Sequence, residues 1–133
     1  MAKANIYLTL SGDSLDFGII EKTLKESPTK TRQKGEALKN GQVFRFSEWI
    51  FDSGFVKIRD ISEIIPVFQR FEDKTDLMIE VAEGNHARWS VLICVRGYED
   101  DYPTLYLPSS FISFAGKIGA DIGFENHIIC AYT

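Results

Sequence analysis

The sequence has little of what metal centres and disulfide frameworks are built from. Its 133 residues include two cysteines and two histidines. No His-x-x-x-His or Cys-x-x-Cys spacing is present, and His86 and His127 lie far apart in the chain. Cys94 and Cys130 both lie in apolar, strand-like runs, so we expect both to be small buried hydrophobic side chains. The sequence predicts no metal site and no cofactor.

Signatures of nucleophilic catalysis and of phosphate binding are also missing. There is no Gly-x-Ser-x-Gly motif, and Ser109-Ser110 is accounted for as a helix start. His127 and Cys130 are three positions apart, which on a regular strand directs their side chains to opposite faces. The glycine-dense segment 116–123 follows a predicted helix, whereas a phosphate-binding loop precedes one. We therefore assign no catalytic residue; the sequence favours a non-enzymatic function and leaves an enzyme as the alternative.

Long apolar runs and an excess of positive charge are absent as well. No run approaches the 18 or so apolar residues that cross a membrane, and residues 1–13 lack the charged-then-apolar layout of a signal peptide. The net charge is −4 and the pI is near 5.2, whereas nucleic-acid-binding domains are usually basic. We expect a cytoplasmic protein that binds neither nucleic acid nor membrane.

What the sequence does have is the composition of an ordinary globular protein. It is 44% hydrophobic and 26% charged, which is typical of soluble domains. Residues 1–133 are predicted to form a single domain, long enough to bury roughly two-thirds of the unfolded surface. The 10 phenylalanines and the 13% aromatic content predict a core built on aromatic packing rather than on disulfides.

Hydrophobic periodicity predicts an α+β chain. Alternating segments predict strands at 6–11, 43–52, 77–82, 89–96, 104–107 and 122–132. Helical spacing predicts helices that begin at Asp13, Ser14 or Asp16, at Ser62, and at Ser109 or Ser110. We expect a two-layer sandwich in which a mainly antiparallel, mixed sheet carries about three helices on one face and is partly open on the other.

Several details follow from single residues. Strand 89–96 is apolar on both faces, so it should lie centrally in the sheet. A helix that starts at Ser62 places Pro66 in its first turn, where proline costs little; a start at Asp60 would place it inside. Residues 83–86 are predicted to close a hairpin between strands 77–82 and 89–96. The last strand is expected to be bulged near Asn126.

The segment 28–51 holds the polar residues that the predicted fold does not require. Lys34, Glu36, Arg45 and Trp49 are candidates for a cationic, aromatic-walled patch that binds an anionic ligand or an acidic surface. Alternatively, Trp49 belongs to the core, Arg45 pairs with Glu48 or another acid, and the lysines are solvated. The loop 29–42 is long for a domain of this size, which is typical of functional or disordered loops.

A second cluster, Glu99, Asp100 and Asp101, lies in a predicted loop. Acidic runs in loops are usually solvated, but these three residues are the first candidates for contact with a basic partner.

Short segments along the whole chain carry a family resemblance. They are Tyr7–Asp13, Pro28-Thr29, Lys34-Gly35-Glu36 with Trp49, and Ile118–Ile122 before the last strand. In these segments the chain resembles the bacterial family catalogued as domain of unknown function 4279, over about residues 4–132. The family has no assigned activity, so the resemblance transfers no catalytic residue. It implies a small bacterial protein, and proteins of this kind are sometimes immunity or accessory proteins near toxin genes.

We therefore expect a domain that binds another protein through one sheet face or through the loop 29–42. A basic partner surface, such as a toxin active site, would suit the acidic balance, since charge complementarity raises association rate and specificity. The alternative is a small-molecule binding protein or enzyme for an anionic ligand, with a pocket near Arg45 and Trp49. A homodimer through an exposed sheet face or edge strand is a third alternative.

Overall fold

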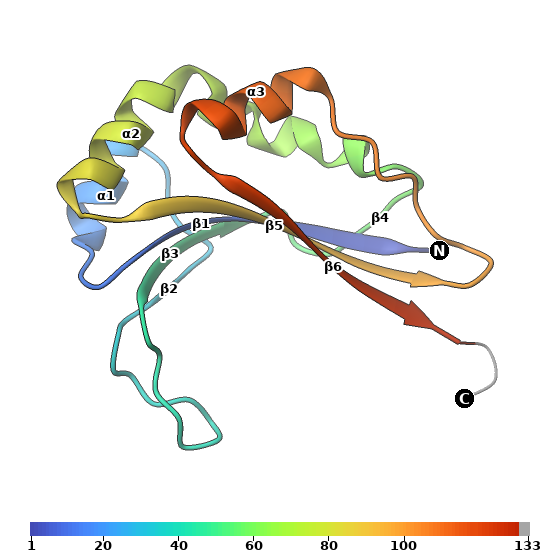
Figure 1. Ribbon diagram of the computed structural model, residues 1–133, viewed down its shortest axis with the longest axis horizontal. Coiled ribbons are helices and arrows are strands. Elements are labelled where there is room, and N and C mark those ends of the chain that lie inside the picture. The colour runs from blue at the N-terminus through green and yellow to red at the C-terminus, as the bar shows by residue number, and fades with distance from the viewer. Residues whose placement is uncertain (131–133) are drawn as a thin grey trace.

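The structure, a computed structural model that describes residues 1–130, consists of one mixed sheet with helices on one side (Figure 1). The elements in chain order are β1 (Lys3–Gly12), α1 (Phe17–Leu24), β2 (Lys30–Arg32), β3 (Ser47–Asp52), β4 (Val56–Lys57), the 3₁₀ helices η1 (Ile61–Glu63) and η2 (Ile65–Lys74), α2 (Thr75–Gly84), β5 (Arg88–Tyr98), α3 (Ser109–Lys117) and β6 (Asp121–Ile129). The strand order is β2-β3-β1-β5-β6, and β4 pairs with the start of β1.

Parallel and antiparallel pairing are both present, with antiparallel pairing in the majority. Strand β1 is antiparallel to β3, β4 and β5, and β2 is antiparallel to β3. Strands β5 and β6 run parallel and are joined through α3. The predicted α+β class, with a mixed sheet and three α-helices, is confirmed, and β5 is the internal strand that its apolar sequence predicts.

Alternation along β1 separates the two faces of the sheet. Ile6, Leu8 and Leu10 are buried under the helices, while Tyr7 and Thr9 on the other face are half-buried. This pattern follows from the period of two in a strand, and it leaves the second face open as predicted.

The core between sheet and helices is aromatic. Trp49 of β3 and Trp89 of β5 meet edge to face, with ring centroids 5.9 Å apart. Phe51 contacts Phe68 and Phe71 of η2 in the same manner, at 5.6 and 5.0 Å. Such pairs add stabilisation to that of area burial alone. The aromatic core that the composition predicts is therefore present.

Residues 77–82, predicted as a strand, belong instead to helix α2. Leu77, Ile79 and Val81 alternate, but Met78 and Val81 are the buried pair, at the i, i+3 spacing of a helix. A hydrogen bond from Trp89 favours the helix over a strand here, because the Trp89 Nε1–H donates to the carbonyl oxygen of Met78 at 2.8 Å. Consequently the predicted hairpin loop at 83–86 is the end of a helix and a turn.

Three helix starts were tested by the structure. Asp16, one of three predicted candidates, caps α1 by accepting from the backbone N–H of Ile19. The prediction of Ser62 is wrong, because Asp60 caps η1 and Glu63 completes a capping box. Pro66 nevertheless lies at the start of η2, where its missing N–H costs little.

Helix α3 does not use the predicted serine cap. Its N-cap is Pro108, and no side-chain hydrogen bond is made there. The predicted strand 104–107 is also wrong, since this segment makes a single bridge, between Thr104 and Asp60.

Residues 33–46, here called the arm, form a hairpin-like extension that hangs below the sheet (Figure 1). Gly35 N–H donates to Phe44 O at 2.9 Å, and Phe44 N–H donates to Glu36 O at 3.1 Å. The predicted loop 29–42 is therefore largely ordered pairing, with β2 at its start. Strand β3 begins at Ser47 rather than Val43.

Two predictions near the chain end are corrected. Strand β6 keeps one continuous register with β5 from Asp121 to Ile129, so there is no bulge at Asn126. Its predicted extension to residue 132 lies outside the described residues. Cys94 is buried at 9% exposure as expected, but Cys130 is exposed because it follows the last paired residue of an edge strand.

The described residues contain neither a membrane-spanning helix nor a cluster of metal-binding side chains. None of its helices is long and apolar enough to cross a membrane. Within residues 1–130, no group of three His, Cys, Asp or Glu side chains is placed to hold a metal ion.

Candidate binding surface

The sheet face turned away from the helices, here called the open face, is concave and framed on two sides. Figure 1 shows the arm descending from one side of it and the end of β6 from the other. Register places Tyr7, Thr9, Ile50 and Leu92 side by side at its centre. Leu92 is 37% exposed although it lies on an internal strand. Exposed apolar surface in the middle of a sheet is a feature of interaction sites.

Two adjoining hollows lie along this surface and share Ser90. The first, of about 820 Å³, lies at the end of the sheet where β1 finishes, and we call it the groove. The second, of about 320 Å³, lies over the centre of the open face, between Tyr7, Lys30, Arg32 and Glu125. The two hollows meet at Ser90 of β5.

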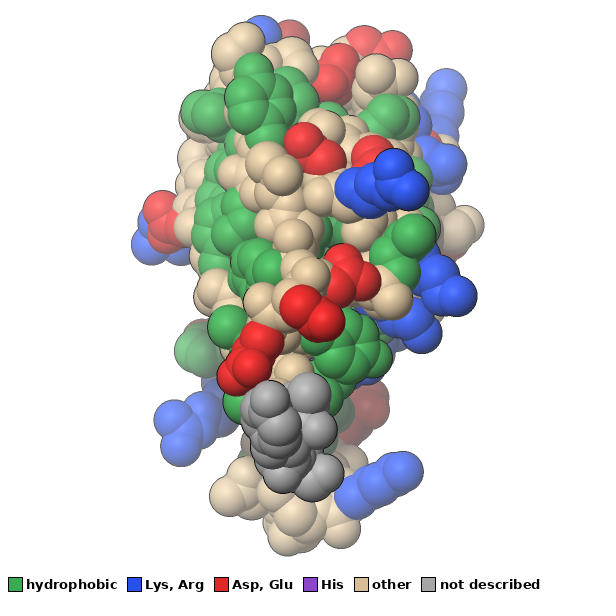
Figure 2. All heavy atoms as spheres, turned by 90° about the vertical axis from the view of Figure 1, so that its right-hand side faces the viewer, with side chains coloured by type: hydrophobic (Ala, Val, Ile, Leu, Met, Phe, Trp, Pro, Cys, Tyr) green, Lys and Arg blue, Asp and Glu red, His purple; other side chains and the backbone are tan. Residues whose placement is uncertain are grey.

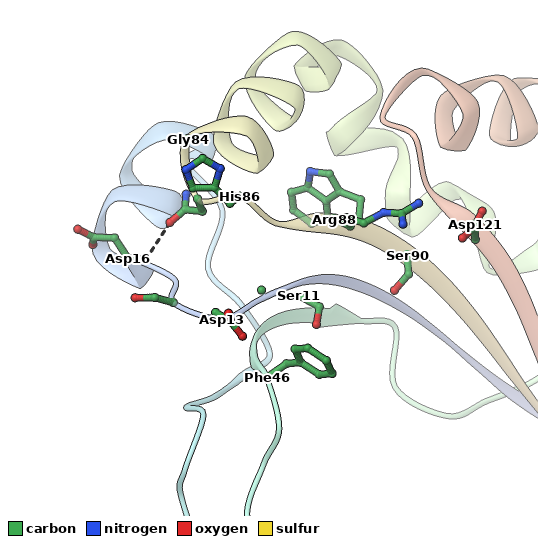
Figure 3. Close-up of a pocket in the computed structure, with 13 residues that line it drawn as sticks. Ser11, Asp13, Asp16, Phe46, Gly84, His86, Arg88, Ser90 and Asp121 are labelled. Atoms are coloured by element: carbon green, nitrogen blue, oxygen red, sulfur yellow. Dashed lines mark hydrogen bonds between the residues drawn. The ribbon is translucent and has the colours of Figure 1, made fainter.

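The groove is assembled from four parts of the chain (Figure 3). Ser11 of β1 and Ser90 of β5 point to the side on which Phe46 of the arm lies, and His86 lies on the other side. Arg88 of β5 and Asp121 of β6 complete its wall. Arg88 makes no ion pair with any described residue, so its guanidinium is available to an anionic group.

The arm is fixed to the end of β1 beside the groove. Lys34 Nζ pairs with Asp13 Oδ1 at 3.1 Å. The backbone N–H of Lys34 donates to Ser47 Oγ, and that hydroxyl donates to the carbonyl oxygen of Asp13. Ser47 is fully buried, so these bonds are shielded from water and hold the base of the arm in place.

Positive charge outnumbers negative charge on the open face. The strand register places these cations on it: Lys3, Lys30, Arg32, Lys57, Arg88 and Arg96. It places these acids there: Glu48, Asp52, Asp121 and Glu125. The arm adds Lys34, Lys39 and Arg45 against Glu36. The groove beside it differs, because three acids, Asp13, Asp16 and Asp121, line it against Arg88. The chain as a whole has a net charge of −4, so the open face carries an excess of cations on an acidic protein.

Aromatic rings hold several of these cations in position. The Arg96 guanidinium lies 4.0 Å from the centroid of Phe55, and Lys30 Nζ lies 5.8 Å from that of Tyr7. Arg32 stacks on Phe44 of the arm at 5.2 Å and also pairs with Glu48 at 3.3 Å. A cation over a ring is attracted to it without losing its charge. Lys30 and Arg96 make no ion pair within residues 1–130 and remain able to attract anions.

The boundary of the open face at β6 contains a small hydrogen-bonded network. Glu125 Oε1 lies 2.9 Å from His127 Nε2, and Cys94 Sγ donates to Glu125 Oε2 at 3.7 Å. The bond from His127, followed by that from Cys94, lowers the pKa of Glu125. Burial, and then the negative charge of Glu125, raises the pKa of the Cys94 thiol. Cys94 is therefore a protonated donor and not a reactive thiolate.

The residues predicted from the sequence do not form one site. Lys34, Glu36 and Arg45 are exposed on the arm, and Arg45 lines neither hollow. Trp49 has no exposed surface and packs on Trp89, as the core alternative proposed. A pocket walled by Arg45 and Trp49 is therefore not what the chain forms here. The role of the exposed arm residues in binding stays a prediction.

The acidic cluster lies at the other end of the sheet. Asp101 pairs with the N-terminal amine of Met1 at 3.3 Å, whereas Lys34 contacts the far end of β1. The length of β1 separates them by roughly 30 Å, at about 3.3 Å per residue. Figure 2 views the molecule from this end. Acidic side chains lie near the centre of the visible face, and most cationic side chains lie around its outline.

Sequence reasoning missed Arg88, Arg96 and Lys30 as members of one surface. The signal was present in β5, where Arg88, Ser90 and Arg96 share one face of an otherwise apolar strand. Joining them to Lys30 required the strand order, which the sequence alone does not supply.

The fold and this surface define a two-layer α+β domain with an uncovered, cationic sheet face. The chain belongs to the family described as "Domain of unknown function (DUF4279)", whose model matches residues 2–128. This confirms the resemblance seen in the sequence. Neither the curated proteins nor the solved structures that were compared gave a match. Residues from three of the segments that carry the resemblance meet around the groove: Gly12 and Asp13, Lys34 through its pair with Asp13, and Asp121.

Proposed function

We propose that this protein is a non-enzymatic binding domain that docks an acidic surface of another protein on its open face. The observation that carries the proposal is the excess of cations on an uncovered sheet face in a chain whose net charge is negative. The positive face attracts an acidic partner, while the negative remainder of the chain repels it. This arrangement selects one docking orientation and raises the association rate.

The shape of the surface favours a macromolecule over a small ligand. The open face crosses the whole sheet from β2 to β6, and the two hollows on it meet at Ser90. The arm and the end of β6 stand at its sides, where they can contact a convex partner (Figure 1). Apolar side chains such as Leu92 lie between the cations, as in the cores of protein interfaces.

The charge distribution changes the expected chemistry of the partner. The acidic balance of the sequence suggested a basic partner, with Glu99–Asp101 as the contact. In the folded chain these acids lie at the end of the sheet away from the groove, and cations outnumber acids on the open face. We therefore place an acidic partner on the open face.

Charge reversal on the open face tests the proposal. The double variant Lys30→Glu, Arg96→Glu is compared with Lys22→Glu, Lys117→Glu, which makes the same change in net charge on exposed positions of α1 and α3. Each tagged protein is used to capture proteins from a lysate of the native host. We expect the wild type and the helix variant to capture the same acidic protein and the open-face variant to lose it. Retention should also fall as salt screens the charges.

A third variant, Glu99→Lys, Asp100→Lys, separates the two candidate surfaces. The proposal predicts that it captures the partner as the wild type does. Loss of capture in this variant with retention in the open-face variant would move the contact to the acidic loop. Equal capture by all four proteins, or no specific capture by the wild type, would contradict the proposal.

A further inference from the structure

Strand β6 is an edge strand with an unused side. Its one neighbour among residues 1–130 is β5, and the pairing runs without interruption from Asp121 to Ile129. The other edge strand, β2, has only three residues. Natural proteins protect long edges with prolines, bulges or a covering loop. β6 contains no proline and no bulge, so its outer backbone groups form a straight template for another strand.

The side chains of this edge are more apolar than solvent exposure favours. Phe124, Ile128 and Ile129 are 43%, 57% and 46% exposed. Phe124 and Ile128 lie on the helix side of the sheet, because they share the register positions of Ile93 and Gly97. Figure 2 shows hydrophobic side chains exposed at the end of the molecule where β6 finishes. A partner strand would cover this surface.

We propose that β6 pairs with β6 of a second copy of this chain, antiparallel, about a twofold axis that passes through Asn126. A twofold axis perpendicular to the sheet keeps the helix layers of both copies on the same side. Residues that lie opposite each other in an antiparallel pair direct their side chains to the same face. The axis must therefore pass through a residue, which lies opposite its own symmetry mate, and not between two residues. The side chains that each register places opposite one another then decide which register is most stable.

Charge and packing select the register centred on Asn126. It places Glu125 opposite His127 of the second copy, and Phe124 opposite Ile128 of the second copy, each contact occurring twice. An axis through residue 125 would place Glu125 opposite its own symmetry mate, and an axis through residue 123 would place it opposite Asp121. Like charges directly opposite each other destabilise a sheet. An axis through residue 127 would oppose the two imidazoles and leave Glu125 facing Ile129. An axis through residue 124 would place His127 opposite Asp121 but leave the exposed Ile128 and Ile129 beyond the paired strand.

The inference goes beyond the proposed function and does not depend on it, because pairing uses the outer backbone groups of β6, whereas the proposed partner contacts the open face that β6 borders. Dimerisation would extend the sheet and bring two open faces onto the same side. Lys30 lies on β2 at the opposite edge of the sheet, whereas Arg96 lies on β5 in register with His127, so the dimer is tested in chains that keep both residues.

Mass measurement by light scattering over a range of concentrations tests the dimer. We expect a concentration-dependent dimer for the wild type, and dissociation about tenfold or more easier for Ile128→Lys, since each lost contact occurs twice. The matched control is Ile112→Lys, which changes an exposed isoleucine of α3 and should leave the dimer unchanged. Circular dichroism establishes that both variants are folded. A wild type that is monomeric at every concentration would overturn the inference.

A cysteine scan tests the register. In a background with Cys94→Ser and Cys130→Ser, single cysteines are placed at 125, 126 and 127 and exposed to mild oxidant. Only Asn126→Cys should form a disulfide-linked dimer, because only this position lies opposite its own symmetry mate. Cross-linking at 125 or 127 in preference to 126, or at none of the three positions, would contradict the register centred on Asn126.

Discussion

Trp49 is the residue on which the two sequence interpretations differed most. Its side chain is fully buried against Trp89, and its Nε1–H has no hydrogen-bond partner among the described residues. A buried donor without a partner costs free energy, so the indole is retained for the area that it buries. Trp49 therefore stabilises the fold beneath the open face and does not contact what binds there.

This account predicts a large stability loss for Trp49→Ala. Removing a buried tryptophan loses its transfer free energy and leaves a cavity, which together cost about 3–5 kcal/mol. Trp49→Phe should cost less, because the ring is kept and the unpartnered N–H is removed. Urea unfolding followed by circular dichroism measures both. A Trp49→Ala loss below about 1 kcal/mol, the range of surface substitutions, would show that the side chain is not a core element.

Single residues also show how far a candidate site can be inferred from sequence. The polar loop around Lys34 stood out by composition, and it is the exposed arm in the structure. Arg88 and Arg96 did not stand out, because each is an ordinary charged residue on the polar side of a strand. They become one surface only because β2, β3, β1 and β5 lie in that order in the sheet, which depends on contacts between residues far apart in the chain.

Among the elements, the helical stretch from η1 to α2 departs most from the sequence prediction. Short runs such as 77–82 satisfy both a two-residue and a 3.6-residue period, and tertiary contacts decide between them. Here Lys74 donates to Leu24 O at 2.8 Å and pairs with Glu26 at 3.4 Å, which ties the end of η2 to the end of α1. The bond from Trp89 to Met78 then fixes α2. By contrast, β1 and β5 were predicted well because their alternation or apolar run is long.

The capping box at η1 gives a prediction about pH. Glu63 accepts from the backbone N–H groups of Asp60 and Arg59 at 2.8 and 2.7 Å, and these bonds lower its pKa. A carboxylate whose pKa is lower in the folded state stabilises the fold at neutral pH. That contribution is lost as the pH falls through the folded pKa, which lies below the ordinary value of a glutamate.

Thermal unfolding of the wild type and of Glu63→Gln across the acidic range measures this contribution. We expect the wild type to have the higher melting temperature at neutral pH and the two melting temperatures to converge in acid. Other groups titrate alike in both proteins, so their effects cancel. A difference that does not change with pH would show that the charge of Glu63 is not involved in the cap.

At the scale of the whole molecule, the distribution of charge over the surface is more informative than the net charge. The net charge of −4 is a statement about solubility. Once the chain is folded, most cations of the strands face one way, and Arg32 connects them to the arm through Phe44. The fold class could be read from the sequence because it depends on local periodicity. The cationic face could not, because it depends on strand order.

Site-specific photocross-linking in living cells of the native host tests the central claim most directly. A photoreactive amino acid replaces Leu92, at the centre of the open face, or Ile112, which is more exposed but lies on α3. The account predicts a cross-linked complex with another protein from position 92, weakened by Lys30→Glu, Arg96→Glu, and none from position 112. Cross-linking from position 112 without cross-linking from position 92 would show that the helix side, and not the open face, is the binding surface.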